Sequence, residues 1–280
     1  MQVRIGVSGW SYRSWHGDYY PSSVRQRDEL AYLAARLSTA EVNASFYRLQ
    51  RPSTYQRWYE TVSADFRFAL KGGRYLTHLR RLRDPRQPLA NFLGSGVLAL
   101  RDRLGPMLWQ LPADFDLTSP DVPAFLAMLP RTYAQAREIA REHGPALAAA
   151  DRHWFGDGEH DALPLHHALE VRGEAGLDRL LPVLAEYDVA LVASDGAGTW
   201  PVFTEPTASF AYVRLHGPEV LYHGGYDDAL LEEWADRIVA WGRDTWVYFD
   251  NDADGRAPHD AERLSTILRG RSECVVPGAV

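Results

Sequence analysis

The chain has 280 residues, a length at which a single α/β barrel is common, and 46% of them are hydrophobic, which excludes an intrinsically disordered chain. Its formal net charge of −7 excludes general adhesion to nucleic acid or anionic lipid, because both need a basic surface. Its single cysteine, Cys274, excludes an internal disulfide and a cysteine-built zinc site, and is typical of a reducing compartment.

The first residues resemble a β-strand at 3–7 and lack the charged, apolar and cleavage segments of a signal peptide. No apolar stretch approaches the length needed to span a bilayer. We therefore expect a cytoplasmic protein with no membrane partner, and the sequence leaves its oligomeric state open.

Eight short β-rich segments alternate with amphipathic helical segments along the chain. This strict alternation predicts a parallel sheet, and eight units predict a single (β/α)8 TIM barrel over residues 1–270 with a C-terminal tail at 271–280. An open doubly wound sheet is the alternative, but no GxGxxG or Walker loop supports a nucleotide fold. Residues 132–165 either continue the alternation or form an insertion over the barrel mouth. The strands are predicted at 3–8, 40–45, 66–71, 107–111, 168–172, 190–194, 211–216 and 246–249, and the helices at 26–37, 53–61, 88–104, 122–129, 132–142, 176–187, 228–241 and 259–268.

Polar side chains gather where the predicted strands end. Because strand side chains alternate between faces, each of three strands places two polar residues on one face and an apolar residue between them. In a barrel the polar set would point into the lumen near the C-terminal mouth, where such enzymes carry their active sites. Internal ion pairing is the structural alternative. The set comprises Glu41, Asn43, Glu170, Arg172, Arg214 and His216, joined by Lys71, Gln110, Asp195, Asp250 and Asn251 at other strand ends.

Lys71 is the only lysine among thirty basic residues. An ammonium can lose its proton or form a Schiff base, whereas a guanidinium stays charged, so a retained lysine indicates a task that arginine cannot perform. Chance survival or a buried ion pair explains it equally well. The segment 67–86 holds seven basic residues and one acid, which favours a solvated face over a nucleic-acid-binding patch.

Aromatic residues such as Trp10 and Tyr47 follow the first two strands, where they either stack on a ligand ring or pack a loop against the barrel. His166, His167 and His259 are expected to be surface or packing residues.

An ordered set of motifs then resembles a known family. The chain contains Gly6-Val7-Ser8-Gly9-Trp10, Glu41-Val42-Asn43-Ala44-Ser45-Phe46-Tyr47, Phe66-Arg67-Phe68-Ala69-Leu70-Lys71 with Thr77-His78, Trp109-Gln110-Leu111-Pro112, Glu170-Val171-Arg172, Tyr212-Val213-Arg214-Leu215-His216-Gly217 and Tyr248-Phe249-Asp250-Asn251-Asp252. In this order they resemble the bacterial and archaeal family named domain of unknown function 72, and the resemblance implies a TIM barrel. Two departures occur: Asp250-Asn251 stands where the family has paired Asn, and Gly173-Glu174-Ala175 lacks an expected Trp.

Three functional hypotheses follow. The first is an enzyme for a small phosphate- or carboxylate-bearing substrate, because arginine forks bind such anions and carboxylates or lysine exchange protons. The second is a metal-dependent phosphodiester hydrolase with a divalent ion held by Glu41, Glu170, Asp195 and His216. The third is a non-catalytic ligand-binding protein. Under the first, which we favour, no metal or cofactor is expected and nucleic acid is the less favoured partner. Its predicted catalytic residues are Lys71, Glu41 and Glu170, and its predicted substrate-binding residues are Asn43, Gln110, Arg172, Asp195, Arg214, His216, Asn251, Trp10 and Tyr47.

Overall fold

The structure is a computed structural model that describes residues 1–149 and 152–278. Ala150 and Asp151, in the proposed 132–165 insertion, and Ala279 and Val280, in the proposed tail, lie outside the described residues. Among the described residues, no helix combines the length and the apolar run needed to cross a bilayer.

Eight parallel strands form a closed barrel in the order β1 to β8, which confirms the predicted (β/α)8 class. Every predicted strand overlaps an observed one. Most strands are buried along both faces, since one face lines the barrel and the other meets helices, and this explains their near-continuous apolar sequences. The strands are β1 (Val3–Ser8), β2 (Thr39–Val42), β3 (Arg67–Lys71), β4 (Leu104–Gln110), β5 (His167–Glu170), β6 (Val189–Asp195), β7 (Phe210–Leu215) and β8 (Asp244–Phe249).

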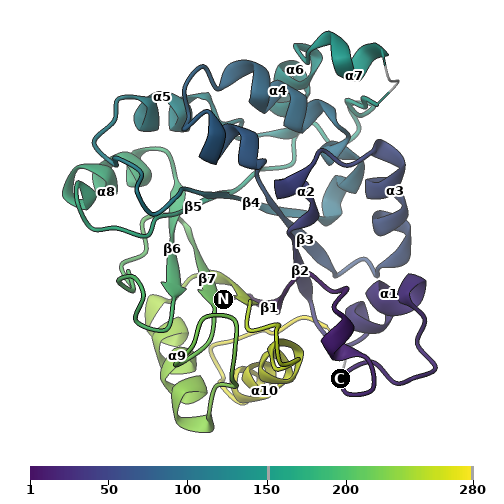
Figure 1. Cartoon of the computed structure of the whole chain (residues 1–280), viewed down its shortest axis with the longest axis vertical. Coiled ribbons are helices and arrows are strands. Elements are labelled where there is room, and N and C mark those ends of the chain that lie inside the picture. The colour runs from purple at the N-terminus through teal and green to yellow at the C-terminus, as the bar shows by residue number, and fades with distance from the viewer. Residues whose placement is uncertain (150–151, 279–280) are drawn as a thin grey trace. The chain divides into compact units, whose positions relative to one another are not determined.

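The described chain divides into two compact units. Unit 1 contains residues Met1–Glu41, Val62–Phe66 and Ala190–Val280. In it β6 pairs with β7, β7 with β8, β8 with β1, and β1 with β2 through Gly6 opposite Thr39. Helices α9 and α10 lie side by side in this unit (Figure 1). Its helices are α1 (Glu29–Ala34), α9 (Asp228–Trp241) and α10 (Ala257–Arg269), with short 3-10 turns η1 (Arg13–Trp15) and η2 (Gln26–Asp28).

Unit 2 contains residues Val42–Thr61 and Arg67–Val189, and its sheet runs β3, β4, β5. Its core centres on Trp109 of β4, whose ring lies 5.1 Å from Phe125 and 5.6 Å from Phe92. Helices α4 and α6 pack together (Figure 1). Its helices are α2 (Ala44–Tyr47), α3 (Pro52–Thr61), α4 (Arg86–Gly94), α5 (Asp121–Met128), α6 (Tyr133–Arg141), α7 (Pro145–Ala149) and α8 (Leu177–Glu186), with the π-helix η3 (Tyr75–Leu79) and the 3-10 helix η4 (Val97–Arg103).

Three predicted strands are wrong at their C-terminal ends. β2 stops at Val42 because Ala44–Tyr47 forms α2, so Asn43 is helical with φ −77° and ψ −23°. Arg172 lies beyond β5, and His216 follows β7. Strand alternation therefore does not place these three side chains. The predicted helix at 88–104 is also two helices, α4 and η4, joined through Gly96 with φ +107°.

Candidate functional site

In unit 1, Glu41 and Arg214 form a buried bidentate ion pair, and neither is more than 1% exposed. The guanidinium donates from Nη2 to Glu41 Oε1 at 2.8 Å and from Nε to Oε2 at 3.1 Å. The same carboxylate accepts from Ser8 Oγ at 2.5 Å and from Tyr212 OH at 2.6 Å. Tyr212 and Arg214 share a face of β7, so one strand supplies both donors. We call these four residues with Asp250 and His216 the Glu41 cluster.

Asp250 and His216 extend this cluster. Arg214 Nη2 donates to Asp250 Oδ2 at 2.9 Å, and His216 Nδ1 lies 2.9 Å from the same oxygen. Arg214 Nη1 lies 3.2 Å from His216 Nε2. Because a guanidinium only donates, Nε2 of His216 is the acceptor in this contact. Every nitrogen of Arg214 thus has an internal acceptor, which leaves this arginine little capacity for a ligand.

Asp252 is a second acid beside this cluster. It is 9% exposed, and its buried Oδ1 has no hydrogen-bond partner among the residues that the structure describes. Burial raises the pKa of the Asp252 carboxyl well above its ordinary value, and the nearby Asp250 charge raises this pKa further. Asp252 is therefore a carboxyl group that retains its proton far more readily than an exposed aspartate.

The remaining unit 1 predictions fall on loop contacts. Asp195 accepts from Tyr226 OH at 3.1 Å, and burial raises the pKa of its carboxyl. Asn251 donates to Gly224 O at 2.8 Å and to Asp260 at 2.9 Å, which ties two loops together. The carbonyl of Trp10 accepts from Tyr20 OH at 2.7 Å.

In unit 2, Lys71 ends β3 beside aromatic and basic neighbours. Its Nζ lies 4.6 Å from the centre of the Phe46 ring, a cation–π distance. The Phe46 ring also meets the His78 ring edge-on at 5.1 Å. Burial lowers the pKa of His78, and the charges of Lys71, Arg74, Arg172 and Arg81 lower it further. We call Phe46, Lys71, His78 and Arg172 the Lys71 cluster.

The π-helix η3 supplies His78, and single π-turns of this kind are frequent at functional sites. The His78 Nδ1 lies 2.9 Å from Thr77 Oγ1, which orients the ring. His78 is therefore an oriented imidazole surrounded by positive charge. This favours the neutral ring and an anionic ligand.

The other predicted residues of unit 2 lie on β4, β5 and α2. Glu170 is fully buried, and its Oε1 accepts from Arg172 Nε and Nη2 at 3.4 Å each. Gln110 is 6% exposed and lies opposite Glu170 in the β4–β5 register. Tyr47 is 76% exposed, so it does not pack a loop.

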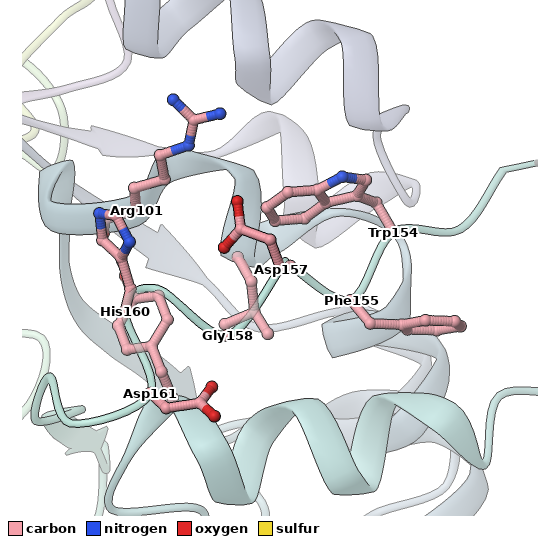
Figure 2. Close-up of a pocket in the computed structure, with 10 residues that line it drawn as sticks. Arg101, Trp154, Phe155, Asp157, Gly158, His160 and Asp161 are labelled. Atoms are coloured by element: carbon pink, nitrogen blue, oxygen red, sulfur yellow. The ribbon is translucent and has the colours of Figure 1, made fainter.

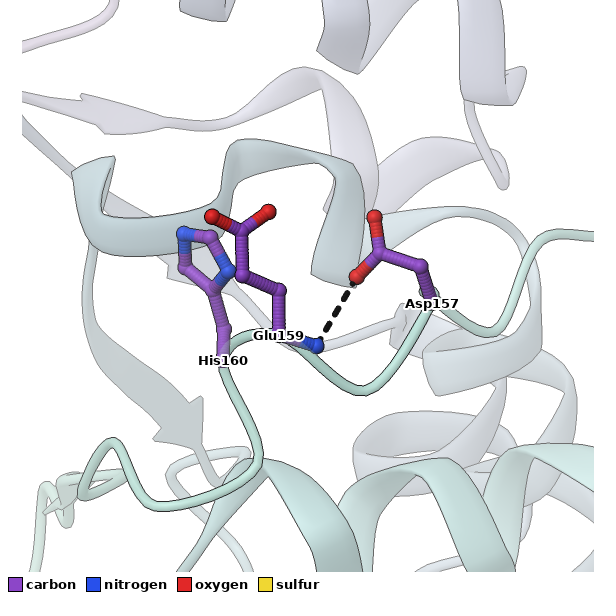
Figure 3. Close-up of side chains that lie close together, drawn as sticks. All are labelled: Asp157, Glu159 and His160. Atoms are coloured by element: carbon purple, nitrogen blue, oxygen red, sulfur yellow. Dashed lines mark hydrogen bonds between the residues drawn. The ribbon is translucent and has the colours of Figure 1, made fainter.

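A separate group in unit 2 lies in the 132–165 segment. Figure 2 shows Arg101, Asp157 and His160 around a small pocket of about 240 Å³. The side-chain nitrogen and oxygen atoms with which Asp157, Glu159 and His160 could bind a metal lie within 4.8 Å of one another (Figure 3). Asp157 Oδ1, however, accepts from the Glu159 backbone at 3.0 Å, which accounts for its orientation. We assign no metal to this group, and none of its members was among the predicted ligands.

Sequence reasoning missed Ser8, Tyr212 and His78 of these clusters, and it missed Asp252 beside the Glu41 cluster. The two-residue spacing from Arg214 could have found Tyr212, because it shares that strand face. His78 and Asp252 both stood in the family motifs given above. The π-helix that places His78 leaves no periodicity in the sequence, however, and the burial of Asp252 is not visible there.

The fold and these clusters define a (β/α)8-barrel protein with ionisable side chains buried where its strands end. The match of a family model over residues 4–278 shows that the chain belongs to the family described as protein of unknown function DUF72. The UPF0759 protein YecE of Escherichia coli K12 is 25% identical over 257 residues, which cover 88% of this chain and 84% of that protein. The UPF0759 protein YunF of Bacillus subtilis is 22% identical over 296 residues, covering 95% and 94%.

Solved structures of the same family share the fold. A DUF72 family protein from Thermotoga maritima superimposes with a TM-score of 0.75 at 22% identity, covering 96% of this chain and all of that one. A DUF72 family protein from Enterococcus faecalis gives a TM-score of 0.70 at 17% identity, covering 96% of each chain. These similarities establish the barrel.

Proposed function

We propose that this protein is an enzyme that acts on a small phosphate- or carboxylate-bearing substrate and binds its anionic group at the Lys71 cluster. The observation that carries the proposal is the positive charge around His78, whose pKa is lowered by burial and then by Lys71, Arg74, Arg172 and Arg81. An anion would offset the repulsion among these cations. The pKa of His78 would then rise when the anion binds.

The proposed chemistry is proton transfer by groups next to that anion. Lys71 is an ammonium partly removed from water and placed on an aromatic ring. His78 is a neutral acceptor near the working pH, which suits a general base. Glu170, a fully buried carboxylate held by Arg172, provides a second proton acceptor within unit 2.

In this proposal Glu41 positions other groups. Its four hydrogen bonds use both carboxylate oxygens, and three donors hold it in place. Because these hydrogen bonds occupy both oxygens, the carboxylate is placed to organise its neighbours rather than to reach a substrate. We assign the Glu41–Arg214 pair the role of fixing His216 and Asp250.

The experiment uses purified protein and two readouts. NMR titration of the His78 imidazole with inorganic phosphate should show saturable binding and a rise in the pKa of His78. Binding should weaken in Arg172→Gln and persist in Lys71→Arg. Turnover should then be sought by NMR across a panel of phosphate monoesters and hydroxy acids, and lost in Lys71→Arg. Undiminished turnover in Lys71→Arg, or an absence of phosphate binding, would overturn the proposal.

A further inference from the structure

We propose a second anion-binding site in unit 2, in a depression that we call the arginine pocket. It is lined by Arg48, Leu49, Gln50, Arg51, Thr54 and Arg152, and its volume is about 890 Å³, part of it open to solvent. The ligand chemistry that it fits is a pyrophosphate group carried by a small molecule. This inference does not rest on the function proposed for the Lys71 cluster.

The pocket wall is held in place by internal hydrogen bonds. Arg48 to Arg51 form the loop between α2 and α3, and Gln50 Nε2 donates across it to Ala44 O and Arg48 O, both at 3.0 Å. Gln50 is only 9% exposed. Arg152 comes from a segment about a hundred residues later, and its Nη2 donates to Leu49 O at 2.9 Å. The loop and the Arg152 side chain are thus held in place before any ligand arrives.

Three arginines line this pocket, and no acidic residue of the described chain lines it with them. Among residues 1–149 and 152–278, Arg48, Arg51 and Arg152 form no ion pair with an acid, whereas Arg86 of the same unit pairs with Glu142. The Nε of Arg152 is buried and has no hydrogen-bond partner among the described residues. The chain as a whole carries a net charge of −7, so these three arginines are a local concentration of positive charge and do not reflect a basic protein.

The local backbone favours the same charge. Helix α3 begins at Pro52 with no acidic residue in its first turn, so its N-terminus adds a partial positive charge beside Arg51 and Thr54. Arginine forks bind phosphate oxygens in pairs, and three of them match the several charges of pyrophosphate better than one carboxylate. Phosphate chemistry therefore satisfies both the charge and the donor geometry of the pocket.

The test is isothermal titration calorimetry with pyrophosphate on the full chain. The wild type should bind, and Arg48→Gln and Arg152→Gln should each weaken binding about tenfold or more, because each removes charge-assisted hydrogen bonds. Arg179→Gln, which neutralises an exposed arginine of α8 in the same unit, is the matched control and should bind as the wild type does.

Three outcomes would overturn the proposal. These are an absence of heat up to millimolar pyrophosphate, wild-type affinity in both Arg48→Gln and Arg152→Gln, and equally tight binding of succinate. Circular dichroism and Arg152→Lys, which keeps the charge, separate loss of the ligand contact from loss of folding. Retained binding in Arg152→Lys with loss in Arg152→Gln supports the site.

Discussion

His167 should make the protein sensitive to mild acid, because it is a neutral imidazole inside unit 2. Trp109 Nε1 donates to its Nδ1 at 3.1 Å, so its proton is on Nε2, which lies 2.7 Å from Pro130 O. The side chain is fully buried, and burial lowers the pKa of His167 from 6.5 to about 3. Protonation would remove the acceptor for Trp109 and place a charge in the core.

The free-energy consequence follows from proton linkage. The unfolded chain binds this proton with a pKa near 6.5, while the folded chain does so only near 3, so acid favours unfolding between these two values. Stability from this group is complete above pH 6.5 and falls as the pH falls. At pH 5 the loss is about 2 kcal/mol, from about 1.4 kcal/mol for each pH unit below 6.5. Such a loss is a large share of a typical domain's stability.

The assay is urea denaturation at pH 7 and pH 5 for the wild type, His167→Asn and His223→Asn. Asn at 167 can still accept from Trp109 but cannot take up the proton. Between pH 7 and pH 5 the free energy of unfolding of His167→Asn should therefore fall by about 2 kcal/mol less than that of the wild type. His223 is largely exposed and is the control, with a pH dependence like that of the wild type. Equal losses in the wild type and His167→Asn would refute the reasoning.

Three further predictions concern the clusters. Lys71→Met should raise the pKa of His78 by removing the largest of its lowering charges, while Lys71→Arg should not, and NMR titration measures both. Glu41→Gln should destabilise the protein by about 3 kcal/mol in urea denaturation, because it breaks a buried ion pair and leaves Asp250 as the remaining carboxylate partner of Arg214. Asp252→Asn should stabilise the protein at pH 8. The pKa of Asp252 is raised in the folded state, so ionisation of this carboxyl at high pH favours unfolding, and Asn cannot ionise; an unchanged urea midpoint would contradict this.

The class of fold was predictable because it depends on period and order. Buried parallel strands require continuous apolar runs, and their alternation with helices allows few topologies. The ends of the strands were less predictable, because strand and helix compete for the residues there. The β2 pattern continues past Val42 in the sequence, but residues Ala44–Tyr47 turn into α2, where Ser45 Oγ donates to Val42 O at 2.9 Å and to Lys71 O at 2.7 Å.

The candidate site was predictable only in its residue types. Glu41 and Arg214 lie inside their strands, where alternation applies, and their side chains meet. Alternation could not show that each would satisfy the other, because that depends on side-chain distances across the sheet. Sequence spacing also gave no reason to join His78 to Lys71, since a π-turn separates them.

The position of Lys71 bears on why one lysine persists in an arginine-rich chain. Its carbonyl is held by Ser45, and a Cβ on the next residue, Gly72, would lie 2.2 Å from the Trp109 ring. The backbone at Lys71 is therefore fixed on both sides, and the ammonium lies over the Phe46 ring. A site that needed only positive charge would accept arginine, as the neighbouring positions 74, 80, 81 and 83 do. A fixed ammonium beside a neutral imidazole instead offers a removable proton, and this property separates a catalytic reading of the Lys71 cluster from simple anion binding.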